Sequence, residues 1–155
     1  MSNDLLYKVA YDEAVRALSE QQAEIDSFRT RSGLLLSAAA ITTSFLGAQA
    51  LHGGDSSLSA WLALGHFVAA AAVSLAILCP YGWEFTANPH KILEIYIDPS
   101  RSMGIEDLQR DLVLSMHDSY LRNRRGVEFL AILFQVASTL LALEIVLWII
   151  AIAST

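Results

Sequence analysis

Three long stretches of the chain carry almost no charge. They extend over residues 33–51, 58–79 and 129–153, and Glu144 is the one Asp, Glu, Lys or Arg residue inside them. About 20 apolar residues are enough to cross the ~30 Å hydrocarbon core of a bilayer. A soluble helical bundle is the alternative, but a chain of 155 residues needs no three runs of this length to build a core. The pattern predicts three transmembrane helices.

The segment before the first span has a helical stripe of mostly apolar residues. Its members recur at alternating spacings of four and three, and they are Tyr7, Tyr11, Ala14, Leu18, Gln21, Ile25 and Phe28. Such heptad spacing is typical of an amphipathic helix that packs on another helix. Because no glycine or proline interrupts the segment, we expect one long helix entering the first span. The stripe can pack within the chain or on a neighbouring copy, and we favour the first.

Residues 80–126 form a second polar segment. Tyr81, Trp83 and Phe85 suit the headgroup level, Asn88 and Pro89 suggest a turn, and residues 91–98 fit a short helix. After a loop over 98–104, an amphipathic helix follows with Ile105, Leu108, Leu112 and Met116 on one face. It either runs unbroken into the third span or kinks at Gly126. The predicted fold is an all-α, three-span bundle with two long helices extending into the cytoplasm, divided at 1–32, 33–79, 80–126 and 127–155.

The basic residues predict the orientation. Four precede the first span and six lie between the second and third, namely Lys8, Arg16, Arg29, Arg31, Lys91, Arg101, Arg110, Arg122, Arg124 and Arg125. Residues 52–57 and the tail after the third span have none. Basic residues near span ends stay in the cytoplasm. We therefore expect a multi-pass membrane protein with its N-terminus in the cytoplasm and its C-terminus outside.

Small residues recur at four-three spacing in the first two spans. They are Gly33, Ser37, Ala40, Ser44 and Gly47 in the first, and Gly65, Ala69, Ala72 and Ala76 in the second. Membrane helices associate through close backbone contact at such residues. We expect these two stripes to pack against each other in a tight hairpin.

Among the residues of the three spans, Glu144 costs the most free energy to insert into the membrane, about 2.5–3.5 kcal/mol for a charge at mid-span. Thr43 and His66 lie at the same depth when residues are counted from the outer ends, roughly 12 Å below the outer face. One interpretation is an ion or proton path with Glu144 titrating and His66 as its partner. The other is a buried Glu–His or Glu–Thr hydrogen bond that holds the helices in register, and we favour it.

The third span has two faces unsuited to lipid. Glu144 shares one with Leu133, Ala137, Leu141 and Trp148, whereas Ala131, Gln135, Ser138 and Ala142 form the other. One face can meet the hairpin. The second predicts contact with another copy, hence a homo-oligomer.

Arginines collect at the inner ends of the spans. Arg29, Arg31, Arg122, Arg124 and Arg125, together with Trp83, are predicted to anchor the protein at lipid headgroups. A regulatory phosphate ligand is the alternative use of the arginines. Glu128 is expected to pair with Arg124 or Arg125 along the helix.

Several function classes lack their sequence signals. The net charge of −6 argues against a nucleic-acid partner, and no Gly-rich phosphate loop, zinc-spaced Cys/His set or nucleophile motif occurs. His90 and His117 stand apart in sequence, and Cys79 is alone, so it is expected to pack as a small hydrophobe. We expect no enzyme, no catalytic residue, no metal and no cofactor.

The stretch QQAEIDSFRTRSGLLLSAAAITTSFLGAQAL, including the Arg29 and Arg31 entry to the span, resembles bacterial membrane effectors of the SLATT type. The resemblance covers the first half of the chain. It implies a small membrane module that accompanies anti-phage systems and is proposed to perforate the membrane. The chain also resembles uncharacterised small bacterial membrane proteins, and both resemblances imply the inner (cytoplasmic) membrane of a bacterium.

These observations favour a homo-oligomeric, channel-like or membrane-permeabilising effector. An accessory subunit of a larger membrane complex and a small proton-coupled transporter are the alternatives. The expected partners are the lipid bilayer, further copies of the chain, and a cytoplasmic sensor or other membrane subunits.

Overall fold

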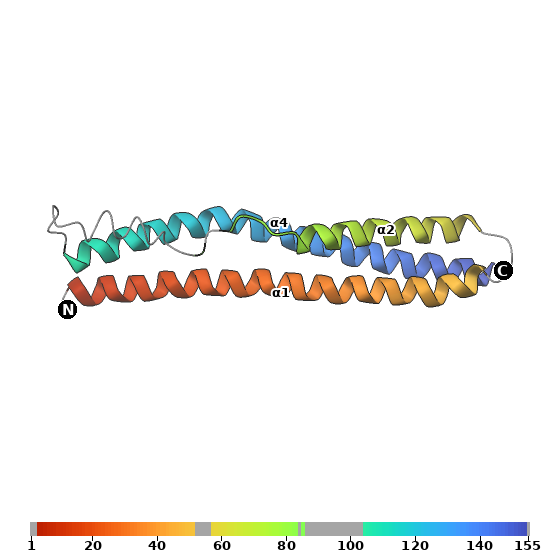
Figure 1. The fold of residues 1–155 in the computed structure, drawn as a ribbon, viewed down its shortest axis with the longest axis horizontal. Helices are drawn as coiled ribbons and strands as arrows, with labels where there is room; N and C mark the ends of the chain where they lie inside the picture. Colours follow the sequence, from red (N-terminus) through yellow and green to blue (C-terminus); the bar gives the residue numbers. More distant parts are fainter. Residues whose placement is uncertain (1–2, 52–56, 84, 86–103, 155) are drawn as a thin grey trace. The chain divides into compact units, whose positions relative to one another are not determined.

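A computed structural model describes residues 3–51, 57–83, 85 and 104–154. Helices make up 93% of these residues, and the described part contains no strand. The helices are α1 (Asn3–Leu51), α2 (Leu58–Leu78) and α4 (Ile105–Ala153) (Figure 1). The predicted all-α fold and the continuity of the first helix into its span are confirmed, and α4 also runs unbroken into the third span.

All three helices are long and apolar enough to cross a membrane. Only 17–22% of their most apolar windows is buried inside the protein, so most of this surface needs an apolar surrounding. Large side chains such as Leu58 and Phe45 are 76% and 73% exposed, which would be costly in water. The chain is therefore an integral, multi-pass membrane protein and not the soluble bundle considered above.

Capping residues and charged side chains account for where α2 and α4 begin and where α2 ends. Ser57 caps α2 by accepting a hydrogen bond from the Ala60 amide, and Pro80 follows its last turn closely. Gly104 precedes α4, whose first turn carries Glu106 and Asp107. Carboxylates at this end suit the positive pole of the helix dipole.

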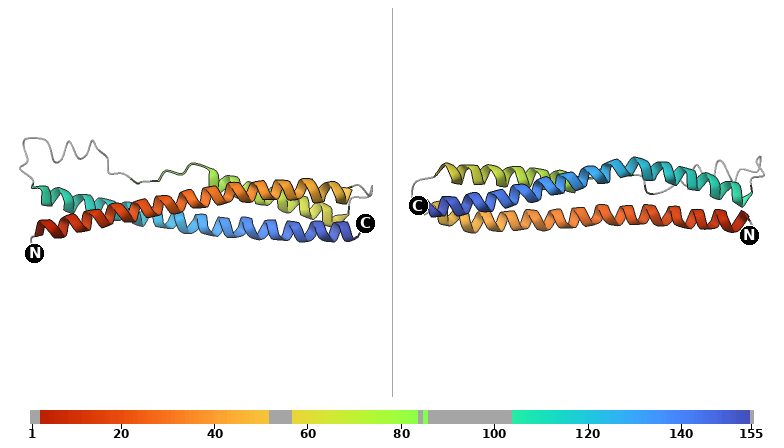
Figure 2. Two further views of the ribbon diagram at one scale, coloured as in Figure 1. Left: turned by 90° about the horizontal axis from the view of Figure 1, so that it is seen from below. Right: turned by 180° about the vertical axis from the view of Figure 1, so that it is seen from behind.

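The chain forms two compact units, each described separately. The polar unit comprises Met1–Ile25 and Tyr81–Glu128. Within it, α1 and α4 lie side by side and run in the same direction (Figures 1 and 2). Leu18, Gln21 and Ile25 are buried, as is Val127 of α4. The predicted heptad stripe thus packs within the chain.

In the same unit, Gly126 allows an aromatic ring to reach the α4 backbone. A Cβ atom at Gly126 would lie 2.5 Å from Cζ3 and 2.6 Å from Cη2 of Trp83. The Trp83 ring also lies 5.9 Å from Tyr81 and 6.4 Å from Phe85, centroid to centroid. Gly126 therefore marks a close contact within the unbroken helix α4.

The apolar unit comprises Asp26–Pro80 and Phe129–Thr155. Its three helical segments lie side by side, with α1 and α4 parallel and α2 antiparallel to both (Figure 2). One buried cluster is built from small residues around a single tryptophan. Its members are Ala50 of α1, Ala60 and Ala63 of α2, and Trp148 and Ala151 of α4. Close approach through alanine is the expected packing mode for membrane helices.

The predicted small-residue stripes do not form the buried faces. Ser37, Ala40, Ser44, Gly65 and Ala72 are exposed; Gly33, Ala69 and Ala76 are half-buried; and Gly47 alone is buried. The buried positions are instead Ser32, Ala39 and Ala50 on α1 and Ala60, Ala63, Ala70, Ser74 and Ile77 on α2. Each face is rotated by about one residue, or 100°, from the prediction. Because alanine is abundant in both spans, periodicity alone did not fix the rotation.

The remaining predictions concern Cys79 and the segments that connect the helices. Cys79 is exposed, so its predicted packing as a small hydrophobe is wrong. The outer turn at 52–56 and the predicted turn, short helix and loop between 86 and 103, with Lys91, Arg101 and His90, lie outside the described residues.

Replacing Gly126 with alanine is expected to destabilise the protein. The new methyl group collides with Trp83, and overpacking costs about 1–3 kcal/mol, more than the ~1 kcal/mol that alanine gains in helix propensity. Thermal unfolding in detergent measures the net loss. Gly33→Ala and Gly65→Ala are matched controls, since neither new Cβ meets an atom within 4 Å, and both should be neutral or stabilising. In a Trp83→Ala background Gly126→Ala should lose its penalty, and a penalty that persists there would disprove the contact.

Candidate intramembrane polar site

Glu144 of α4 is completely buried in the apolar unit, with 0% exposure. The hydroxyl of Thr43, on α1, donates a hydrogen bond to its Oε1. The indole Nε1 of Trp148 donates to the same oxygen at 3.3 Å. The costly carboxyl group is thereby held by one donor from its own helix and one from the neighbouring helix. This arrangement links α1 to α4 inside the membrane-spanning region.

Helical spacing and one glycine position the two donors. Trp148 lies one turn after Glu144, so both side chains share a face with Ala137 and Ala151, and all four are buried. A Cβ atom at Gly47 would lie 3.2 Å from Cη2 of Trp148. The missing side chain at Gly47 lets the indole ring approach the backbone of α1. Trp148 was placed on the Glu144 face in the sequence, but its role as a donor was missed, although the spacing of four residues carries that signal.

The second carboxyl oxygen is left without a partner. Oε2 of Glu144 is buried and accepts no hydrogen bond from any described residue. An unsatisfied buried polar atom is destabilising by about 1–3 kcal/mol. Both donors converge on Oε1, so the site is asymmetric.

His66 does not join this site. Its Nδ1 lies 2.8 Å from the carbonyl oxygen of Leu62, one turn earlier on α2, and neither oxygen of Glu144 is bonded to it. The predicted His66–Glu144 pair is therefore wrong for the described structure. Counting residues from the span ends gave an equal depth, but depth does not fix the direction of a side chain. The imidazole found a carbonyl acceptor on its own helix.

A small apolar cavity adjoins the two donors. Its volume is about 240 Å³, and its wall consists of Thr43, Gly47, Ala48, Ala60, Trp61, Leu64 and Trp148. Glu144 is not part of the wall. Its two donors do line the cavity, whereas the carboxyl group itself is completely buried, so the geometry suits an interhelical link better than an open binding site for an ion.

The face of α4 opposite Glu144 carries small and polar side chains. Gln135, Thr139 and Ala142 are exposed, and Ala131 and Ser138 are half-buried. Ser138 and Thr139 donate to the carbonyl oxygens of Phe134 and Gln135 on their own helix, at 2.8 and 2.9 Å. The side-chain amide of Gln135 has no hydrogen-bond partner among the described residues. That this second face avoids lipid and meets another copy stays a prediction.

The predicted anchor residues take several local positions. Arg124 pairs with Glu128 at 3.0 Å, which confirms that predicted pair, and both side chains are more than 60% exposed. Arg29 lies 3.9 Å from Asp26, and its Nε is buried without a hydrogen-bond partner among the described residues. Arg122 donates to Ser119 at 3.3 Å, Arg31 and Arg125 are exposed, and Trp83 packs on Gly126. Headgroup anchoring by these residues stays a prediction.

Within the described residues no group of three or more His, Cys, Asp or Glu side chains is placed to hold a metal ion. No family model matches the chain, and neither a curated protein nor a solved structure matches it.

Replacing Thr43 with valine should destabilise the apolar unit by about 0.5–1.5 kcal/mol, because Glu144 Oε1 loses one of its two donors while the side-chain volume is kept. The free energy of unfolding in bicelles measures the loss. Thr42→Val is the matched control, as Thr42 is not bonded to Glu144. In a double-mutant cycle with Glu144→Leu, the cost of Thr43→Val should largely disappear. Equal effects of the two threonine variants would contradict the link.

Proposed function

We propose that the chain is a homo-oligomeric, channel-like membrane protein. In the assembly, the polar face of α4 (Ala131, Gln135, Ser138, Thr139 and Ala142) meets the same face of neighbouring copies around a shared axis. The exposed amide of Gln135 is the observation that carries this proposal.

A glutamine side chain in contact with lipid leaves two donors and one carbonyl unsatisfied. The hydroxyls of Ser138 and Thr139 avoid that cost by bonding to their own helix, whereas the Gln135 amide has no such bond. Contact with another amide or with water in a central channel would satisfy it. In homo-oligomers around a symmetry axis the same residue from each copy is brought together, so glutamine can bond to glutamine.

Small exposed residues on α1 support close approach of a second copy. Ser37 and Ser44 are exposed, and each donates to a carbonyl of its own helix, at 2.9 and 2.7 Å. With Ala40 between them they form a face of small residues, flanked by the exposed side chains of Ile41 and Phe45. Such faces favour helix–helix contact in membranes. Since this face is not buried within the chain, it is available for contact between chains.

This proposal assigns Glu144 a structural role. The carboxyl group is enclosed within one copy by Thr43 and Trp148, so it fixes the rotation of α4 and thereby directs Gln135 outward. A permeation path would follow Gln135, Ser138 and Thr139. The N-terminus lies in the cytoplasm of a bacterium, and permeabilising the inner membrane, as an anti-phage effector, is the activity that the SLATT-like stretch favours.

The oligomer is tested by the mass of the protein in nanodiscs, expressed without partners. Wild type should give one discrete oligomer, and Gln135→Leu should shift it to monomers. Gln49→Leu is the matched control, because Gln49 is exposed near the end of α1, and it should leave the mass unchanged. A wild-type monomer that becomes discrete only with other native proteins would support an accessory subunit instead.

Channel activity is tested separately by conductance across planar bilayers and by depolarisation of cells that overexpress the protein. Wild type should conduct, and Gln135→Leu should reduce conductance at least about tenfold. An oligomer that neither conducts nor depolarises cells would refute the channel while leaving the assembly intact.

A further inference from the structure

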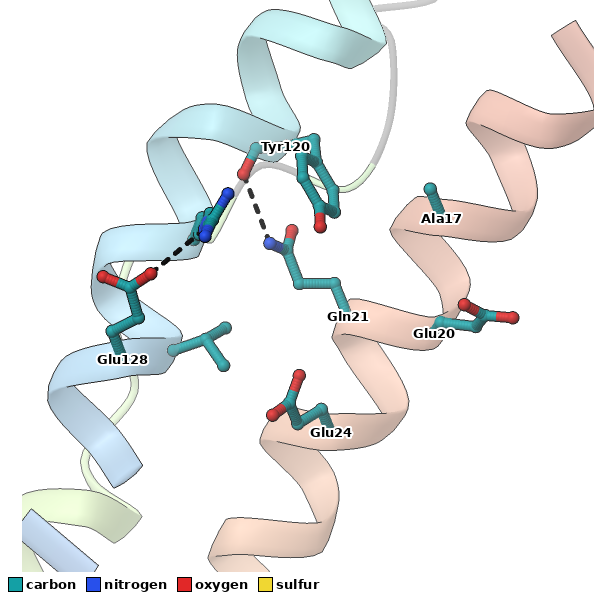
Figure 3. Close-up of a pocket in the computed structure, with 8 residues that line it drawn as sticks. Ala17, Glu20, Gln21, Glu24, Tyr120 and Glu128 are labelled. Carbon is teal, nitrogen blue, oxygen red and sulfur yellow. Dashed lines mark hydrogen bonds and ion pairs between the residues drawn. The ribbon is translucent and has the colours of Figure 1, made fainter. Parts of the chain in front are cut away.

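The polar unit contains a cavity of about 410 Å³ between α1 and α4 (Figure 3). Its wall consists of Ala17, Glu20, Gln21 and Glu24 from α1 and Tyr120, Arg124, Val127 and Glu128 from α4. This volume lies within the range of small-molecule sites. Three carboxylates and one guanidinium line it, so the wall is acidic.

The charged side chains on the cavity wall differ in whether they are already paired within the chain. Glu128 is paired with Arg124 at 3.0 Å. Glu20 is paired with Arg16 at 2.9 Å, and this hydrogen bond, with the charges of Glu20 and Glu13, raises the pKa of Arg16. Glu24 forms no ion pair or hydrogen bond with any described residue. One unneutralised carboxylate therefore remains, and Figure 3 shows it on the side of α1 that faces α4.

Gln21 supplies a second unused acceptor. Its side chain is only 5% exposed, and its Nε2 donates to the carbonyl oxygen of Tyr120 at 3.2 Å. That carbonyl can only accept, so it fixes which end of the amide faces it. The other end, Oε1, is buried and has no hydrogen-bond partner among the described residues. Gln21 and Glu24 are three residues apart, so both acceptors lie on one face of α1.

We propose that this cavity binds an organic cation through an ammonium or guanidinium group. Such a group offers several N–H donors in a small space, which matches the buried oxygen of Gln21 and the carboxylate of Glu24. The ring of Tyr120 provides a surface for a cation, and Ala17 and Val127 provide contacts for an alkyl chain. An anionic ligand fits poorly, because Arg124 already faces Glu128.

The site is independent of the proposed channel. It lies wholly in the polar unit and requires no second copy. Two sources supply the same chemistry, namely a free alkylamine or alkylguanidine and the lysine or arginine side chain of a protein partner. The probes below separate them.

Binding is measured by isothermal titration calorimetry on the full chain in nanodiscs, with agmatine and Nα-acetyl-arginine amide as probes. Glu24→Gln should weaken binding at least about tenfold by removing the free carboxylate. Gln21→Met, which keeps the length but removes the carbonyl, should weaken it comparably. Glu20→Gln is the matched control: it lines the same cavity on the same helix, but its carboxylate is paired with Arg16 and is directed away from α4 in Figure 3. It should change affinity less than about twofold.

Tighter binding of agmatine supports a free small cation, and equal or tighter binding of the arginine amide supports a side chain of a partner. The proposal is overturned if neither probe binds at millimolar concentration, or if Glu20→Gln weakens binding as much as Glu24→Gln. The second result would mean that the probes respond only to the acidic surface. Loss of binding with the oligomer mass unchanged separates this site from the proposed assembly.

Discussion

A carboxyl group placed inside an apolar helix must find hydrogen-bond donors, and in this chain that requirement governs the rotation of α4. Glu144 is held by Thr43 from α1 and by Trp148 from its own helix. Once this face of α4 is turned inward, Ala137 and Ala151 are buried with it. The residues on the opposite side, Gln135 among them, are then exposed. A single polar requirement thus decides both what is buried and what is presented to the surroundings.

The second feature that brings segments of the chain together is the packing of a tryptophan ring on a glycine. Trp148 lies on Gly47 in the apolar unit, and Trp83 lies on Gly126 in the polar unit. In the apolar unit, where the helices are surrounded by lipid, apolar association contributes little, so close van der Waals contact has to supply the attraction. A large flat ring on a bare backbone gives more such contact than two side chains of medium size. In both places the glycine is needed for space and not for an unusual backbone conformation.

The two units satisfy their polar groups differently. In the apolar unit, hydroxyl groups donate hydrogen bonds to carbonyl oxygens of their own helices, as in Ser37, Ser44, Ser138 and Thr139. Such bonds satisfy the hydroxyl donors where water is absent. In the polar unit, ion pairs such as Arg16–Glu20 and Arg124–Glu128 are exposed, and exposed pairs add little stability. Gln135 in the apolar unit, and Gln21 with Glu24 in the polar unit, do not follow these patterns. The Gln135 amide, Oε1 of Gln21 and the Glu24 carboxylate have no hydrogen-bond partner among the described residues, so a further molecule could supply one.

The sequence by itself determined the helices, the three apolar spans, the heptad stripe with Gln21 on it, and the need of Glu144 for a partner. These features follow from local periodicity and from the cost of polar groups in lipid, and both can be read without knowing neighbours. Only the tertiary structure decided that Thr43 and Trp148, and not His66, bind Glu144. It also decided which alanine-rich face of each span is buried and that Gly126 receives Trp83. Depth along a helix is fixed by counting residues, but rotation about the helix axis is fixed only by what packs beside it.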